Sequence, residues 1–303
     1  MGIDGPATDM LQPFGKTQAL RLLVIGGTGR LGRLIGPVLR AQPGLACVFQ
    51  ARAEHRGGDI IFDPLGDAAA YAHAAGAADV ILNLAGPVSF VRGGDTQAQW
   101  DQHVALAQAA IAASNGCPVV QVSSAAVYGD PGPQSCAEAQ PLAPLSPYGQ
   151  AKQATESAVA DHANVTVVRI GNVAGADALL AGSNAAATLR KLHVLPDGRG
   201  LQRSYIGPLA LARALTRLVR LLAAGADVPK TINLALPGVV GMDDLLRAAD
   251  MAFTPETAPA GTIAQVDLDV GRAIDLGLVP GAPARADDII ADLRAVIEME
   301  PRP

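Results

Sequence analysis

Residues 21–32 read Arg-Leu-Leu-Val-Ile-Gly-Gly-Thr-Gly-Arg-Leu-Gly, a short apolar run that ends in a cluster of glycines. Gly26, Gly29 and Gly32 have the spacing G-x-x-G-x-x-G, and a helical pattern follows them. A strand, a glycine turn and a helix in this order are the context of a loop that binds dinucleotide phosphates. Gly26 would allow the tight turn, Gly29 would let a pyrophosphate approach the backbone, and Gly32 would let helix and strand pack closely. The pyrophosphate would lie at the positive helix start near Arg30.

The composition limits the classes of partner. Half of the 303 residues are apolar and 17% are charged, so we expect a real core without long disorder. The net charge of -5 provides no basic surface for nucleic acid or an anionic membrane, and aromatic residues for base stacking are scarce. We therefore expect a small-molecule substrate, no nucleic acid and no membrane.

Signals for targeting and for metal binding are missing from the sequence. Residues 1–16 have neither a basic segment nor an apolar core, so they do not predict a signal peptide. No apolar run is long enough to predict a membrane span, and we expect a cytoplasmic protein. Cys47, Cys117 and Cys136 are too few and too scattered for a disulfide framework or a zinc site, so we expect no metal.

From residue 20 onward, apolar runs alternate with helical patterns. This alternation predicts an α/β fold with a doubly wound parallel sheet of the Rossmann type. The strand candidates are nearly continuous apolar runs, as expected for strands buried on both faces. They are residues 22–25, 46–50, 59–62, 80–84, 119–122 and 165–170, and the helices expected among them are 29–41, 67–75, 96–114 and 147–162.

The alternation changes after Gly171. Three regions are predicted: an N-terminal tail over 1–19, a dinucleotide-binding domain over 20–172, and a small substrate-binding cap over 173–303 that is partly interleaved with the sheet. In the cap we expect loops at 175–182 and 195–200, helices at 208–224, 242–253, 267–276 and 287–298, and a strand at 231–235. Residues 126–147 predict a long loop, and long loops in compact domains are usually functional.

Tyr148 and Lys152 are four residues apart, so on a helix they share one face. Ser146 can cap this helix and Pro147 suits its first turn. Ser124 ends the preceding apolar strand, at the carboxyl edge of the sheet where open α/β folds bind ligands. A hydroxyl before a Tyr–Lys pair, on a chain that opens with a phosphate loop, predicts a catalytic site.

These residues resemble the extended short-chain dehydrogenases/reductases, in the NAD(P)-dependent epimerase/dehydratase group. The resemblance implies the Rossmann fold, a nicotinamide cofactor and redox chemistry at carbon. The matching segments follow the family's order from residue 20 to about 250, and they are 26–32, 59–63, 83–86, 122–129, 146–152, 169–172 and 211–214.

The resemblance assigns catalysis to Ser124, Tyr148 and Lys152. Tyr148 would be the general acid/base, and because an unperturbed phenol titrates near about pH 10, the Lys152 cation would favour its phenolate. Lys152 would also hydrogen-bond the nicotinamide ribose, and Ser124 would hydrogen-bond the substrate oxygen. The cofactor would perform the hydride chemistry.

The resemblance also implies two sets of binding residues. The cofactor set is Gly26, Thr28, Gly29, Arg30, Leu31, Gly32, Arg52, Asp63, Leu65, Leu84, Ala85, Gly86, Val122, Tyr148 and Lys152. The substrate set is Ser124, Ala125, Asn172 and Arg203.

The choice between NAD and NADP depends on the end of the second strand. NAD binders carry an acidic residue there, which accepts a hydrogen bond from the ribose 2′-OH. We expect that position at Ala51, and Arg52 follows it. Arg30, Arg52 and Arg56 would bind a 2′-phosphate, because guanidinium groups suit phosphate oxygens. NADP is therefore the expected cofactor, with NAD as the alternative.

Departures from the family pattern narrow the reaction. Ala125 and Ala126 replace the Asp–Glu pair of the sugar-nucleotide dehydratases, so a dehydratase, which needs an acid and a base, is not expected. Arg203 matches the family's clamp on a substrate phosphate. The second, arginine-containing clamp has no counterpart between Phe253 and Asp267. This weakens the case for a UDP- or dTDP-sugar as substrate.

Three functions remain open. The first is an NAD(P)-dependent oxidoreductase that acts on a carbonyl or secondary alcohol, sugar-like substrates included. The alternatives are a nucleotide-sugar epimerase with a tightly bound cofactor and a non-catalytic NADP-binding protein. His103, where the family's helix carries Asn, is either a core or surface histidine or a functional one. In the family's manner, the helices expected at 96–114 and 147–162 would form a homodimer interface.

Overall fold

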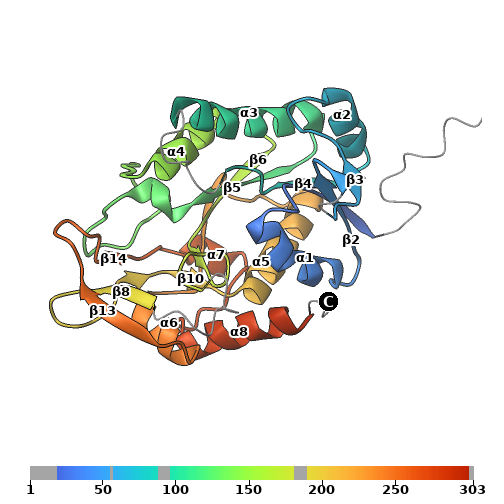
Figure 1. Cartoon of the computed structure of the whole chain (residues 1–303). Helices are drawn as coiled ribbons and strands as arrows, with labels where there is room; N and C mark the ends of the chain where they lie inside the picture. The colour runs from blue at the N-terminus through green and yellow to red at the C-terminus, as the bar shows by residue number, and fades with distance from the viewer. Residues whose placement is uncertain (1–18, 55–56, 88–95, 181–189, 300–303) are drawn as a thin grey trace, which may run out of the picture.

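The computed structural model describes residues 19–54, 57–87, 96–180 and 190–299. At its centre lies a seven-stranded sheet with the order β11-β6-β5-β4-β1-β2-β3, and every neighbouring pair is parallel (Figure 1). The strands are β1 Leu20–Ile25, β2 Leu45–Ala51, β3 Ile60–Ile61, β4 Val80–Asn83, β5 Val119–Ser124, β6 Val165–Ile170 and β11 Thr231–Leu234. The predicted doubly wound parallel sheet is confirmed.

Helices cover both faces of the sheet (Figure 1). On one face pack α1 Arg30–Arg40, α5 Pro208–Ala223 and α8 Ala286–Met299, and on the other α2 Ala68–Gly76, α3 Thr96–Ser114 and α4 Pro147–Val159. Successive side chains of a strand point to opposite faces, so the apolar run of β1 serves two cores. Leu22 and Val24 join the core under α1 and α5, whereas Leu23 and Ile25 join the core under α2 and α3.

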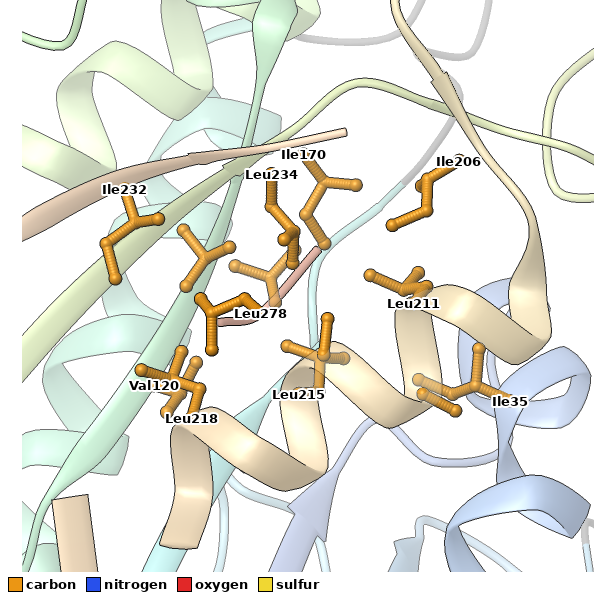
Figure 2. Packing of buried hydrophobic residues seen from close by; sticks show 14 of the residues in the cluster. Ile35, Val120, Ile170, Ile206, Leu211, Leu215, Leu218, Ile232, Leu234 and Leu278 are labelled. Carbon is orange, nitrogen blue, oxygen red and sulfur yellow. The ribbon is translucent and has the colours of Figure 1, made fainter. Parts of the chain in front are cut away.

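Helix α5 shows how the last third of the chain covers the sheet. Leu211, Leu215 and Leu218 are fully buried at a spacing that places them on one side of this helix. Figure 2 shows them facing residues of β5, β6 and β11. Burial of each such leucine stabilises the fold by about 1.5–3 kcal/mol.

The remaining elements form a smaller region beside the carboxyl edge of the sheet (Figure 1). Three short sheets order it: β10 with β7, β13 with β8, and β9 between β12 and β14. The elements are η2 Ala125–Tyr128, β7 Asn172–Val173, β8 Arg190–Val194, β9 Gln202–Arg203, β10 Tyr205–Ile206, β12 Val240–Gly241, α6 Met242–Ala248, β13 Phe253–Thr257, β14 Gln265–Val266 and α7 Gly271–Asp275. Of the helices in the described ranges, none is long and apolar enough to cross a membrane.

Two helix predictions in this region are wrong. The helix expected over 242–253 ends at Ala248, and Phe253 instead begins a strand that pairs with β8. The helix expected over 267–276 is reduced to Gly271–Asp275, because Leu268 forms a bridge with Cys136. In both cases a distant segment of backbone provides hydrogen bonds that override the local preference for helix.

Candidate active site

A cavity of about 610 Å³ lies outside the carboxyl ends of β1 to β4. The strand order reverses between β1 and β4, and ligands of open α/β sheets bind at such a switch point. The cavity is lined by Gly26, Thr28, Gly29, Arg30, Leu31, Gly32, Gln50, Arg52, Ala53, Asp63, Pro64, Leu65, Leu84, Ala85, Gly86, Pro87, Gln102 and Leu106. Among the described residues expected at the cofactor, all line this cavity except Val122, Tyr148 and Lys152.

The glycine turn forms a cradle that suits a diphosphate. Gly26 has φ +73°, and a Cβ there would lie 2.8 Å from the backbone N and Cα of Ala85. A Cβ on Gly32 would lie 2.3 Å from the Gly27 carbonyl oxygen, so helix α1 packs against the turn at a distance only glycine permits. The N-cap, Gly29, gives α1 no side-chain capping bond, and its first turn holds no acidic residue. Its first N–H groups therefore remain available to an anion.

The sequence analysis placed the ribose-binding position of the second strand at Ala51. In the structure, the neighbouring Gln50 is the residue whose position at the end of β2 lines the cavity. Ala51 is buried, whereas Gln50 lines the cavity. The Gln50 amide accepts a hydrogen bond from Gly26 N at 3.2 Å and donates to Phe62 O at 2.6 Å. Strand register could have located it, because β2 pairs with β1 up to Phe49 opposite Val24, which places the next residue beside the glycine turn.

Positive charge dominates the outer part of this cavity. Arg30 and Arg52 are both exposed and line it, against the single carboxylate of Asp63 in the described lining. Arg30 Nη1 donates to Ala176 O at 3.1 Å, and the Asp63 carboxylate accepts from Leu65 N at 3.1 Å. Arg56, also expected at the cofactor, lies outside the described residues.

Ser124, Tyr148 and Lys152 come together beside the cavity. Ser146 Oγ accepts from Gly149 N at 3.1 Å and Pro147 follows it, so α4 begins where the capping signals predict. Burial raises the pKa of the Tyr148 phenol, and a hydrogen bond with the Ser124 side chain opposes that rise. The structure therefore brings the hydroxyl at the end of β5 onto the phenol of α4.

Lys152 is buried at the same place, with 4% of its surface exposed. Its Nζ donates to Val122 O at 3.0 Å and lies 5.8 Å from the centre of the Tyr148 ring. Burial lowers the pKa of Lys152 to about 8, and the Glu156 carboxylate acts in the opposite direction. The lysine thus places a strongly desolvated cation next to the phenol.

His103 on α3 completes this cluster. Its side chain is buried, and its ring centre lies 6.0 Å from that of Tyr148 in an edge-on arrangement at 70°. A Cβ on Gly86 would lie 2.6 Å from the His103 ring, so these two are in close contact. Burial, together with the Lys152 charge, lowers the pKa of His103 to about 4, and a hydrogen bond with the Pro87 backbone opposes this shift. The imidazole is therefore neutral at physiological pH.

A second cavity of about 310 Å³ lies on the other side of the cluster. It is lined by Ser124, Ala125, Ala126, Gly129, Leu145, Ser146, Asn172, Arg203, Ser204, Ile263 and Val266, which include all four residues expected at the substrate. Gly86 lines the first cavity and a Cβ there would lie 3.7 Å from Lys152 Nζ, whereas Ser124 lines the second. Tyr148 and Lys152 therefore stand between the two cavities.

A buried polar network below the cluster was not found from the sequence. Arg169 makes a paired interaction with the Glu156 carboxylate, with Nη2 to Oε2 at 2.7 Å, and both side chains are almost fully buried. Ser123 Oγ donates to the same carboxylate, and Arg169 Nη1 donates to the Tyr128 hydroxyl at 2.9 Å. Only the four-residue spacing from Lys152 to Glu156 was available as a signal.

Known proteins resemble this arrangement. A family model described as "NAD dependent epimerase/dehydratase family" matches residues 22–234. No curated protein matches the sequence.

Solved structures share the fold at low sequence identity. The UDP-glucose 4-epimerase of Brucella ovis, solved in complex with NAD, has a TM-score of 0.76 and 22% identity over 90% of this chain and 96% of that one. The UDP-glucose-4-epimerase of Stenotrophomonas maltophila, solved with bound NAD and formylated UDP-arabinopyranose, has a TM-score of 0.73 and 21% identity. The match covers 93% of this chain and 100% of that one. A dTDP-4-dehydrorhamnose reductase of Clostridium acetobutylicum has a TM-score of 0.69 and 17% identity. The match covers 92% of this chain and 100% of that one. These likenesses show the fold, and the model match shows the family.

Proposed function

Because the chain belongs to the NAD-dependent epimerase/dehydratase family of extended short-chain dehydrogenases/reductases, we propose that it is an NADP(H)-dependent oxidoreductase that interconverts a ketone and a secondary alcohol. The observation that carries this proposal is the position of Ser124, Tyr148 and Lys152 between a dinucleotide-sized cavity and a second, smaller one.

The three side chains have complementary tasks in the reduction. The Ser124 hydroxyl orients the carbonyl oxygen, and the Tyr148 phenol gives that oxygen its proton. Lys152 favours the phenolate that remains, because an adjacent cation stabilises the charged form. When bound, the nicotinamide supplies the hydride that reaches the carbonyl carbon. One hydride and one proton convert the ketone to the alcohol, and NADPH becomes NADP⁺.

Cofactor choice is proposed from the charges at the adenosine end. NAD binders use a carboxylate at the end of the second strand to accept a hydrogen bond from the ribose 2′-OH. Here that strand end has the neutral Gln50, whose amide oxygen and nitrogen already bond Gly26 N and Phe62 O. Arg30 and Arg52 instead offer guanidinium groups to a 2′-phosphate. Arg52→Gln should weaken NADPH binding by about 10-fold or more and leave NADH binding unchanged, as measured by cofactor fluorescence titration. Arg33→Gln, an exposed residue of the same helix as Arg30 but not in the cavity lining, is the matched control.

The catalytic proposal is tested by NADPH oxidation with a panel of carbonyl compounds. Tyr148→Phe should reduce turnover by about 10²–10⁴-fold while NADPH still binds, because the proton donor is lost and the cavity is kept. Tyr71→Phe is the control, since its hydroxyl is buried in the α2 core without a hydrogen-bond partner in the described structure. Turnover that survives Tyr148→Phe would show that another group transfers the proton.

Epimerisation of a nucleotide sugar is the second candidate, favoured by the position of Arg203 in the second cavity. The same three catalytic residues would serve it, with oxidation and reduction in one cycle. This candidate predicts that cofactor co-purifies with the protein and that turnover needs no added NAD(P). Mass spectrometry of the purified protein distinguishes the two.

A further inference from the structure

The two cavities differ in size by about a factor of two, 610 Å³ against 310 Å³. The larger suits a dinucleotide, which is two nucleosides joined by a diphosphate. A nucleotide sugar keeps one nucleoside and the diphosphate and replaces the other nucleoside with a hexose, so it is of similar bulk. The smaller cavity lies at the lower end of the range of about 300–1,000 Å³ for small-molecule sites. It matches a compact substrate.

The one cation in the described lining of the second cavity is already partly committed. Arg203 Nη1 donates to Gln202 O at 2.7 Å and to Ala264 O at 3.2 Å, and Nη2 donates to Ile263 O at 2.8 Å. A guanidinium has five N–H donors, so Nε and the second hydrogen of Nη2 remain. These can bind one anionic group, whereas a diphosphate with its ribose and base asks for many more donors.

The other polar groups of this cavity are largely satisfied by the protein. Ser204 Oγ donates to Gly238 O at 3.0 Å and accepts from Leu268 N at 2.9 Å. The Asn172 side chain hydrogen-bonds the Tyr205 hydroxyl. Ser146 Oγ caps helix α4. In the described lining, the Ser146 O–H, the rest of the Asn172 amide and the two N–H groups of Arg203 remain for a ligand. These are fewer than the partners that a nucleotide sugar needs for the polar groups it buries.

The remaining lining is apolar. Ala125 and Ala126 follow Ser124, and Ile263 and Val266 line the same cavity. Leu145 stands at the edge with 66% of its surface exposed, the most exposed large apolar side chain in the described structure. An exposed leucine at the mouth of a cavity gains most when an apolar ligand covers it.

We infer that the substrate is a compact ketone, or the matching secondary alcohol, with an apolar body and one anionic group such as a carboxylate. Its carbonyl lies at Ser124 and Tyr148, its apolar body covers Ala125, Ala126 and Leu145, and its anion faces Arg203. This inference rests on the proposed reductase function and excludes nucleotide sugars as ligands of the second cavity.

Matched ligands test the inference. Binding to the full-length protein saturated with NADP⁺ is measured by calorimetry, and turnover is followed as NADPH oxidation. The compact probes are levulinate and benzoylacetate with their methyl esters, and the nucleotide sugars are UDP-glucose and UDP-galactose. We expect the keto acids to bind and to be reduced, the esters to follow more weakly, and the nucleotide sugars to do neither.

Two variants separate the roles of charge and apolar surface. Arg203→Gln should raise the KM of a keto acid about 10- to 100-fold more than it raises the KM of the methyl ester, because only the acid uses the charge. The ester thereby reports whether the site still folds. Leu145→Asp should raise KM for both ligands without a change in kcat. Ile297→Asp, another exposed apolar side chain but on α8 and remote from the cavity, is the control.

Failure of the inference and failure of the proposed function have different signatures. Binding or Tyr148-dependent turnover of UDP-glucose overturns the inference and leaves the reductase chemistry intact. Absence of binding by all the keto acids and esters also overturns it, as does an Arg203→Gln variant that weakens acid and ester equally. Reduction of keto acids that is unaffected by Tyr148→Phe overturns the proposed function.

Discussion

The two cavities beside Ser124, Tyr148 and Lys152 are built in different ways. The larger cavity includes a stretch of backbone, the glycine turn and the start of α1, where no side chain caps the first N–H groups. The substrate cavity is built from side chains whose polar atoms are mostly bonded to the protein already. A backbone site needs glycine at fixed spacing, and this can be recognised in a sequence. The lining residues of a side-chain site can be recognised from motifs, but their hydrogen bonds depend on distant contacts that a sequence does not show.

Loss of the buried ion pair between Arg169 and Glu156, which lies below the Ser124–Tyr148–Lys152 cluster, should have the largest effect on stability. Arg169→Met should lower the free energy of unfolding by about 3–5 kcal/mol, because it leaves the Glu156 carboxylate buried without its cation. Urea unfolding measures this change. Lys191→Met breaks the exposed pair with Glu256 and should leave the free energy of unfolding nearly unchanged, because solvent screens this pair. Equal costs would show that burial does not determine the strength of these pairs.

The backbone character of the cofactor cavity is tested by a single methyl group. Gly26→Ala should weaken NADPH binding by about 10- to 100-fold, because alanine is strained at φ +73° and its Cβ would meet the Ala85 backbone. Fluorescence titration gives the affinity. Gly76→Ala, at the end of α2 where a Cβ meets open space, should leave affinity unchanged. An unaltered affinity in Gly26→Ala would mean that the turn can relax.

The burial of Lys152 between the two cavities should lower the free energy of unfolding at neutral pH. Burial lowers its pKa from 10.5 to about 8. Below about pH 8 the lysine is protonated in both states, and the buried cation destabilises the folded protein relative to the unfolded chain. That cost disappears as the pH rises from about 8 to 10.5. Lys152→Met should therefore raise the free energy of unfolding at neutral pH by about 2 kcal/mol and abolish turnover, with the gain shrinking above pH 8. Denaturant unfolding across pH checks the sign.

His103 should affect stability only in acid, and at neutral pH its contribution is absent. Its folded pKa of about 4 lies below the ordinary 6.5, so between these values the unfolded chain binds a proton that the folded protein does not. Stability is therefore lost as the pH falls from 6.5 to 4, by at most about 1.4 kcal/mol per pH unit. His103→Gln should flatten this slope in thermal melts, and His193→Gln, an exposed histidine of β8, should not.

Much of the fold follows from local sequence. The apolar runs that became β1, β4, β5 and β6 were predicted because strands buried on both faces are apolar throughout. The resemblance to the family and the doubly wound sheet are confirmed. The short strands of the cap could not be predicted, since β13 pairs with β8, about sixty residues earlier in the chain.

Individual residues of the candidate site could be predicted from the sequence, but their contacts could not. Gly26, Ser124 and Tyr148 were placed from motif spacing, and their roles stay predictions until tested by mutation. Gln50, which lines the larger cavity, was not among the predicted residues, because the sequence does not show which side chains at the end of β2 face that cavity. The commitment of Arg203 to backbone carbonyls could not be read either, since its partners lie about sixty residues away.

Strand β11 has a consequence for how the protein is made. It pairs with β6 at the edge of the sheet, yet it follows β6 by some sixty residues, and α5, which lies between them in the chain, covers the same face. A growing chain that has left the ribosome only as far as Ile170 exposes an unpaired strand edge and an apolar sheet face, both of which invite aggregation. Folding must therefore wait for the last third of translation, and a truncated product should depend on chaperones to remain soluble.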